Sequence, residues 1–127
     1  MDTKVMIVGS EKGHPKRRPR IRLAGFWLNG IGFEYNSLVS VKYGQGHIIL
    51  RLEGFGLETY GKVVKRVMST KGGLVQIRQE WHNKKLTPHL EVKGIWLEQF
   101  GFKIGSIIAV QCEYGVINIR LLDLDKL

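Results

Sequence analysis

The residues of this chain that are best suited to chemistry form a run of cations near its beginning. The segment KRRPRIR, residues 16–22, carries five Lys or Arg side chains around a single proline. Guanidinium groups bind phosphate oxygens through a planar, bidentate fork, and the proline favours an extended backbone. Arg20 and Arg22 alternate with Ile21 and Leu23, so we expect both arginines on one face of a strand. We predict phosphate contacts for Lys16, Arg17, Arg18, Arg20 and Arg22.

Two further groups of cations follow later in the chain. Lys65 and Arg66 belong to a basic segment, residues 62–71, whose spacing places its charges on one face of a short helix. Lys84 and Lys85 follow Trp81, and an exposed indole beside cations is a platform on which single-stranded bases stack. A buried Trp81 is the alternative that the sequence leaves open. We add these five residues to the predicted nucleic-acid-binding set.

Residues for catalysis or metal binding are sparse. The eleven acidic residues form no cluster in sequence of the kind that holds divalent ions, and Cys/His pairs with the spacing of zinc ligands are absent. A metal-free ribonuclease needs a general acid and base with a cation at the scissile phosphate. The candidates are His14, His47, His82 and His89, and we expect each to be a surface side chain. The sequence therefore predicts no metal, no cofactor and no assignable catalytic residue.

The charge of the chain favours a polyanionic partner. Its 127 residues carry 20 Lys/Arg against 11 Asp/Glu, a formal net charge of +9 that is concentrated in residues 1–30 and 53–88. Such a distribution is the footprint of RNA or DNA binding, although solubility alone is a simpler explanation. No apolar run approaches the length of a membrane span. The single cysteine, Cys112, excludes an internal disulfide, so we expect a cytoplasmic protein without membrane contact.

An internal repeat organises the elements that must position these cations. Residues 4–52 align without gaps with residues 73–121, at an offset of 69, and 14 of the 49 aligned pairs are identical. A unit of this length buries too little surface to fold alone, so both copies are expected to share one core. We therefore predict a single domain, residues 1–127, made of repeat 1 (4–52), a linker (53–72) and repeat 2 (73–121).

Each repeat predicts the same elements. A short apolar strand (4–8 and 74–77) precedes a polar, basic loop, and a second strand follows the proline. The stretches FWLNGIGF and IWLEQFGF then predict one or two helical turns, ended by Gly32 and Gly101. Glycine-bearing connections between β-branched runs predict the hairpins 38–43/47–52 and 107–112/116–121. Core side chains are expected from Trp27, Leu28, Ile31, Trp96, Leu97 and Phe100.

The string Pro-x-Ile/Leu-x-Leu/Val-x-Gly-x-Trp-Leu-x3-Gly-Phe, followed by a Val-rich hairpin, resembles the SymE-type toxin family of type I toxin–antitoxin systems. The strongest match covers residues 19–52 and 88–121. The resemblance implies a mainly β fold, namely an AbrB/MazE-like swapped-hairpin β-barrel that two tandem repeats form as an intramolecular pseudo-dimer, with one short helix per repeat. It further implies a cytoplasmic toxin that suppresses growth by acting on nucleic acid, as an endoribonuclease of RNA or by association with nucleoid DNA.

Three other readings stay open. An AbrB-like transcriptional regulator would prefer duplex DNA and contact bases in the major groove. A non-catalytic antitoxin or adaptor would instead use its basic loops on an acidic protein partner. A true ribonuclease would cleave RNA and depend on one of the histidines. In each reading the chain is a monomer with an internal pseudo-dimer that is free to associate further.

Overall fold

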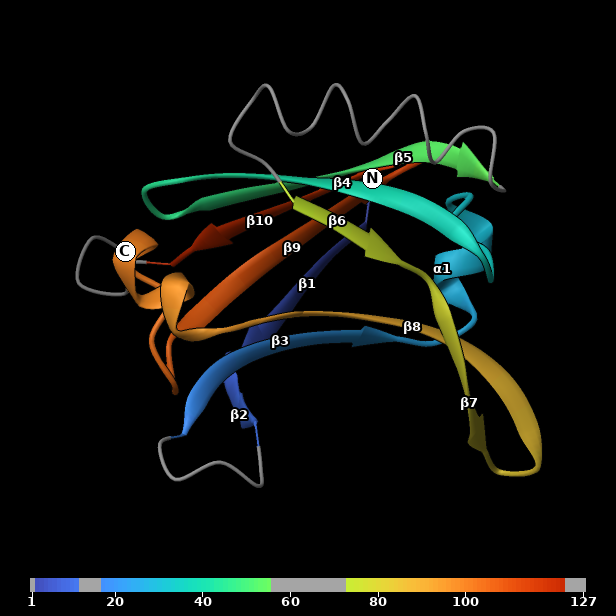
Figure 1. The fold of residues 1–127 in the computed structure, drawn as a ribbon, viewed down its shortest axis with the longest axis horizontal. Coiled ribbons are helices and arrows are strands. Elements are labelled where there is room, and N and C mark those ends of the chain that lie inside the picture. The colour runs from blue at the N-terminus through green and yellow to red at the C-terminus, as the bar shows by residue number, and fades with distance from the viewer. Residues whose placement is uncertain (1, 12–16, 56–72, 123–127) are drawn as a thin grey trace.

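The computed structural model describes residues 2–11, 17–55 and 73–122, and this part of the chain is mainly β (Figure 1). It holds two antiparallel sheets and two short helices, as the sequence predicts at this level. The first half contains β1 (Asp2–Ile7), β2 (Gly9–Glu11), β3 (Arg18–Ala24), α1 (Trp27–Gly30), β4 (Ser37–Gly44) and β5 (His47–Phe55). The second half contains β6 (Gly73–Gln76), β7 (Arg78–His82), β8 (Lys85–Lys93), the 3-10 helix η1 (Ile95–Phe100), β9 (Ile107–Glu113) and β10 (Val116–Leu121).

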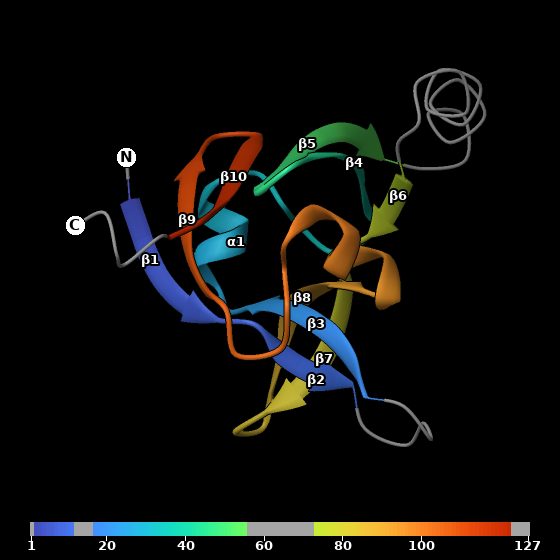
Figure 2. The same cartoon turned by 90° about the vertical axis from the view of Figure 1, so that its left-hand side faces the viewer.

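The strands divide into a six-stranded and a four-stranded sheet. The six-stranded sheet has the order β1-β9-β10-β5-β4-β6, and the four-stranded sheet has the order β2-β3-β8-β7. Figure 2 shows the larger sheet arching over the smaller one. The chain crosses between them at Val8 and at Ile77, two fully buried residues that lie 69 positions apart. Their amides donate to the carbonyls of Ser106 and Ser37, respectively, so each crossing is held against the other half of the chain.

Each half contributes its first strand to the hairpin of the other half. β1 pairs with β9, whereas β6 pairs with β4, and the central pairs β5–β10 and β3–β8 join the halves. Because β1 and β6 each form an edge, neither sheet closes on itself within the described residues. The described residues thus form two antiparallel sheets around one core.

Both polar stretches expected as loops contain strands instead. Gly9–Glu11 pairs with Arg18–Arg20, and Arg78–His82 pairs with Lys85–His89. The second hairpin turns at Asn83 and Lys84, whose φ angles are 49° and 64°. Two successive residues with positive φ are the mark of a tight hairpin turn that matches strand twist. The prediction was wrong because polar residues on a partly solvated sheet give no clear strand pattern. In the β7–β8 hairpin, the turn also has no glycine that would have marked it.

The core lies between the two sheets and under the two helices. Leu28, Leu97, Phe33 and Phe102 are fully buried, at matching positions in the two halves. Trp27 and Trp96 pack against this cluster while staying partly exposed, as do Ile31 and Phe100. The expected core residues all contact the core. The two phenylalanines, which follow the helices, contribute more complete burial than the tryptophans.

The Gly-x-Trp motif has a direct structural cause. Gly25 and Gly94 adopt φ angles of +136° and +138°, and a Cβ added there would lie 2.6 and 2.5 Å from Cδ1 of Trp27 and Trp96. Each indole folds back over its glycine and donates its N–H to the last carbonyl of the preceding strand, at 3.0 Å to Ala24 and 3.1 Å to Lys93. A side chain at either glycine would displace the ring.

Among the described residues, the helices are too short and too polar to cross a membrane.

Candidate nucleic-acid interface

The positive charge of the described residues gathers on the four-stranded sheet. The strands of this sheet, the β7–β8 turn and Arg17 just before β3 carry eight Lys/Arg against three Glu, a net charge of +5. The rest of the described chain carries five Lys/Arg against five Asp/Glu and is neutral. We call this surface the cationic face; its cations are Arg17, Arg18, Arg20, Arg22, Arg78, Lys84, Lys85 and Lys93, and its carboxylates are Glu11, Glu80 and Glu91.

The alternation of β3 sets which side chains reach this face. Ile21 and Leu23 are 2 % and 0 % exposed, whereas Arg18, Arg20 and Arg22 are each partly exposed on the other side of the strand. The prediction that Arg20 and Arg22 share a face is therefore confirmed. Cross-strand pairing then places Arg20 opposite Lys93 and Arg22 opposite Glu91, on the same side of the sheet.

Carboxylates are interleaved with the cations of the face. Glu91 lies 3.7 Å from Arg20, 3.8 Å from Arg22 and 3.5 Å from Lys93, so one carboxylate holds three cations. Glu11 lies 3.0 Å from Arg18 and 3.2 Å from Lys93. These pairs fix the positions of the cationic groups. Glu11 and Glu91 each pair with more than one cation, and the face keeps a net charge of +5.

Residues of the edge strand β7 extend this ion-pair network. Arg22 also pairs with Glu80 of β7, and Arg78 lies opposite His89 across the β7–β8 pair. Burial lowers the pKa of His89, and the nearby charges of Arg22 and Arg78 lower it further against the opposing effect of Glu91. Nδ1 of His89 is buried without a hydrogen-bond partner. Burial and the charges of two nearby guanidinium groups thus favour the neutral form of the His89 imidazole.

Trp81 lies beside the cationic face but not on it. It pairs across the hairpin with Leu86, and the two side chains are 73 % and 43 % exposed. Because successive strand residues point to opposite sides, Trp81 projects away from Glu80 and the ion pairs. Of the two readings that the sequence left open, the exposed indole is therefore the correct one.

A groove runs beside Leu86 at the base of this hairpin. It has a volume of about 390 Å³ and is lined by Tyr35, Leu86 and the amide side chains of Asn36, Gln76 and Gln79. Tyr35 is 49 % exposed. One side of the hairpin therefore presents aromatic rings and amide groups. The other side presents Lys85, on the same side of the sheet as the arginines of β3.

The structure brings together only part of the predicted set. Arg18, Arg20 and Arg22 join one ion-pair network, with Arg17 exposed just before it and Lys84 and Lys85 exposed at the hairpin turn. Trp81 occupies the other side of the hairpin. Lys16, Lys65, Arg66, His14 and the basic segment 62–71 lie outside the described residues.

Sequence reasoning missed Arg78, Lys93 and the carboxylates that hold the arginines. The alignment of the repeats carried a signal for them, since Glu11 and Glu80 are one of the 14 identical pairs. Glu91 stands at the position of Arg22 in the other repeat, and the two residues are direct cross-strand partners. The change from Arg22 in one repeat to Glu91 in the other therefore indicated an ion pair between the repeats. It could be recognised only once the structure showed that the repeats pair through β3 and β8.

The other candidates for chemistry are placed as follows. His47 lies in β5, where its Nε2 is 3.4 Å from Oδ1 of Asn118, far from the cationic face in the strand order. Cys112 is buried in β9, as expected for a strand residue. Within residues 2–11, 17–55 and 73–122, no group of three His, Cys, Asp or Glu side chains is arranged to hold a metal ion.

No protein-family model, no curated protein and no solved structure matches this chain.

Proposed function

We propose that this protein binds nucleic acid and that its cationic face follows the phosphodiester backbone. The observation that carries the proposal is the segregation of charge, because the four-stranded sheet holds a net +5 while the rest of the described chain is neutral. A solubilising charge has no reason to gather on one sheet, whereas phosphate binding requires such a field. Arginines held in place by carboxylates lose little freedom when a phosphate takes the remaining N–H donors.

The preferred ligand in this proposal is single-stranded, with RNA as the first candidate. The support is the β7–β8 hairpin, which carries the exposed Trp81, Lys84 and Lys85 and whose Leu86 lines a groove with aromatic and amide-bearing residues. Unpaired bases can stack on an indole and reach amide groups, whereas bases within a duplex cannot. A nucleic-acid strand that follows the cationic face would reach this hairpin at the start of β8.

The resemblance to SymE-type toxins extends the proposal to a cytoplasmic toxin that acts on RNA. The exchange of first strands between the halves supports a related proposal, that the tandem repeats form a fused, swapped-hairpin pseudo-dimer. In this proposal the second repeat supplies within one chain what a partner subunit would supply to a single repeat.

The test compares two double variants that remove equal charge. Fluorescence anisotropy would follow a labelled single-stranded RNA and a duplex DNA of equal length over a salt series. Arg18→Ala/Arg20→Ala should weaken RNA binding and reduce the salt slope, d log K/d log[salt], by about 1.4 in magnitude for two lost contacts. Lys42→Ala/Arg51→Ala, on exposed positions of the six-stranded sheet, should leave both unchanged.

Each alternative reading has its own outcome in this experiment. Equal losses in both double variants would reduce the binding to net charge and refute a specific face. Preference for the duplex would favour an AbrB-like regulator. No binding to either nucleic acid would leave the protein-binding adaptor as the better reading.

RNA cleavage is a second candidate because of the position of His89. An imidazole whose pKa is lowered by burial and by the nearby charges of Arg22 and Arg78 combines a general base with cations that can stabilise a phosphorane-like transition state. A denaturing gel of RNA incubated with pure protein tests it. Cleavage that His89→Ala abolishes, with binding retained, would establish this role, and intact RNA would restrict the protein to binding.

A further inference from the structure

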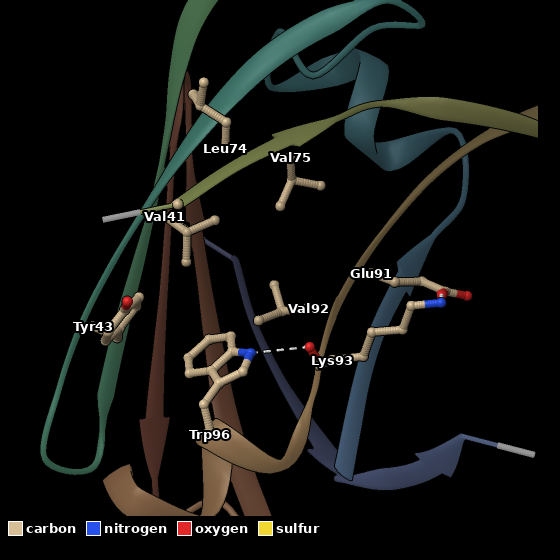
Figure 3. A pocket seen from close by; sticks show the side chains of 9 residues that line it. Val41, Tyr43, Leu74, Val75, Glu91, Val92, Lys93 and Trp96 are labelled. Atoms are coloured by element: carbon tan, nitrogen blue, oxygen red, sulfur yellow. Dashed lines mark hydrogen bonds and ion pairs between the residues drawn. The ribbon is translucent and has the colours of Figure 1, made fainter. Parts of the chain in front are cut away.

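A second cavity lies between the two sheets and borders the cationic face at Glu91 and Lys93. It has a volume of about 310 Å³ and is bounded by β4, β6, β8 and the ring of Trp96. Figure 3 shows Val41, Val75 and Val92 around its centre, with Trp96 and Tyr43 closing one end. The lining is thus mainly apolar, with two aromatic rings at one end of the cavity.

The aromatic end is a small cluster of rings. The centroids of Tyr43 and Trp96 are 4.7 Å apart with their planes tilted by 41°, and Phe100 packs against Tyr43 at 4.7 Å. The Trp96 indole is fixed by its N–H donated to the Lys93 carbonyl. Tyr43 and Trp96 both line the cavity, and the π-electron density on the face of an aromatic ring attracts cations.

The other half of the chain shows what such a surface accepts. There the ammonium group of Lys4 lies over the ring of Trp27, 5.0 Å from its centroid. Trp27 and Trp96 are 69 positions apart, as are Lys4 and Gly73 and the strands β1 and β6 that bear them. The chain therefore covers one tryptophan with its own ammonium group and carries a glycine at the place from which the second would be covered.

The position of Gly73 has no side chain, and the space that a side chain would occupy there is open. A Cβ added there would meet only Cβ of Val41, at 3.9 Å, an ordinary contact distance. At the rim of the cavity, Glu91 and Lys93 pair with each other at 3.5 Å, and both belong to the cationic face.

We propose that this cavity binds a small alkylammonium ligand, whose cationic head lies over Trp96 as Lys4 lies over Trp27. The butyl-length stem would pack on Val41, Val75 and Val92, and the head would be held by the rings of Trp96 and Tyr43. The cavity shares Glu91 and Lys93 with the cationic face, but the ammonium proposal does not depend on nucleic-acid binding. A cavity of about 310 Å³ suits a ligand of this size.

The probe is n-butylammonium, the side chain of lysine without its backbone, titrated into the full-length protein and followed by NMR. The indole N–H and ring signals of Trp96 should shift in a saturable way in the millimolar range, and those of Trp27 should not. Neutral n-butanol is the matched control, and it should bind at least about fivefold more weakly because it lacks the cation–π attraction. Equal binding of butanol would make the cavity merely apolar and overturn the proposal.

Two variants test the proposal, one by filling the cavity beside Trp96 and the other by uncovering Trp27. Gly73→Lys supplies an internal ammonium group and should abolish binding while keeping the fold, which the melting temperature checks. Lys4→Gly uncovers Trp27 and should add a second set of saturable shifts, from Trp27. Unchanged binding in folded Gly73→Lys would contradict the proposal, and so would the absence of Trp27 shifts in Lys4→Gly.

Two further probes distinguish the source of the ligand. Binding of Nα-acetyl-lysine-methylamide at an affinity similar to that of butylammonium would assign the site to a lysine side chain. Tighter binding of putrescine, with the lysine derivative excluded by its backbone, would assign it to free polyamines. If neither probe shifts Trp96, the ammonium proposal fails.

Discussion

Glu91 is the residue whose removal tests the cationic face most sharply. Its carboxylate lies within 3.5 to 3.8 Å of Lys93, Arg20 and Arg22, so Glu91→Gln releases three cations at once and raises the net charge of the face from +5 to +6. Glutamine keeps the length and nearly the shape of the side chain. The effect on binding is therefore electrostatic rather than steric.

The expected size follows from counterion release. One additional phosphate contact on a single strand adds about 0.7 to the salt slope, so affinity at about 0.1 M salt should rise roughly fivefold. The folded state should lose about 1 kcal/mol or less, because the partners of Glu91 are a third to a half exposed and such pairs are screened by water. A gain in affinity together with a small loss of stability is a combination that damage to the fold does not produce.

The assay is anisotropy with a labelled single-stranded RNA at several salt concentrations, beside urea denaturation of the same preparations. The matched control is Glu98→Gln, which removes the same charge from an exposed position on η1, outside the four-stranded sheet. We expect the control to change affinity by less than about 1.5-fold, because an exposed charge elsewhere on the surface is screened at this ionic strength. Equal gains in the two variants, or no gain in Glu91→Gln, would refute the reasoning.

Other expected outcomes concern stacking, pH and the core. Trp81→Ala should weaken single-stranded RNA binding by about 1–3 kcal/mol without changing the salt slope, and a loss confined to the slope would contradict stacking. Because the pKa of His89 is lowered in the folded state, the unfolded chain takes up the proton first; stability should fall as pH drops below about 6.5 and through the lowered pKa, a loss that His89→Gln should remove. Urea denaturation at several pH values measures this, and an identical profile in the variant would exclude His89. Phe102→Ala should cost about 3–5 kcal/mol and the partly exposed Trp96→Ala clearly less, so a larger cost for Trp96→Ala would reverse the assignment of the core.

Much of the local structure could be predicted from the repeat alone. The hairpins β4–β5 and β9–β10 and the short helices that follow Gly25 and Gly94 match the predicted positions, because each rests on a local signal: β-branched alternation, or glycine where φ is positive. The alternation of Arg20 and Arg22 with buried Ile21 and Leu23 was visible for the same reason.

The arrangement of the sheets was not predictable in this way. Strands β2 and β7 were missed because their residues are polar, although each pairs with the next strand along the chain, β3 or β8. The crossings at Val8 and Ile77 depend on carbonyls of the opposite half. The role of Glu11 and Glu91 in holding the arginines follows from the same long-range pairing, so the sequence indicated the cations without the carboxylates that position them.

The central claim is that one sheet carries the nucleic-acid interface. A titration of isotope-labelled protein with a short single-stranded RNA, followed residue by residue through backbone amide NMR signals, tests it most directly. We expect the amide shifts to cluster on β2, β3, β7 and β8, with those of Arg18, Arg20, Arg22 and Trp81 among the largest. Added salt should reverse these shifts. Shifts centred on the six-stranded sheet, or spread evenly over both sheets, would contradict it.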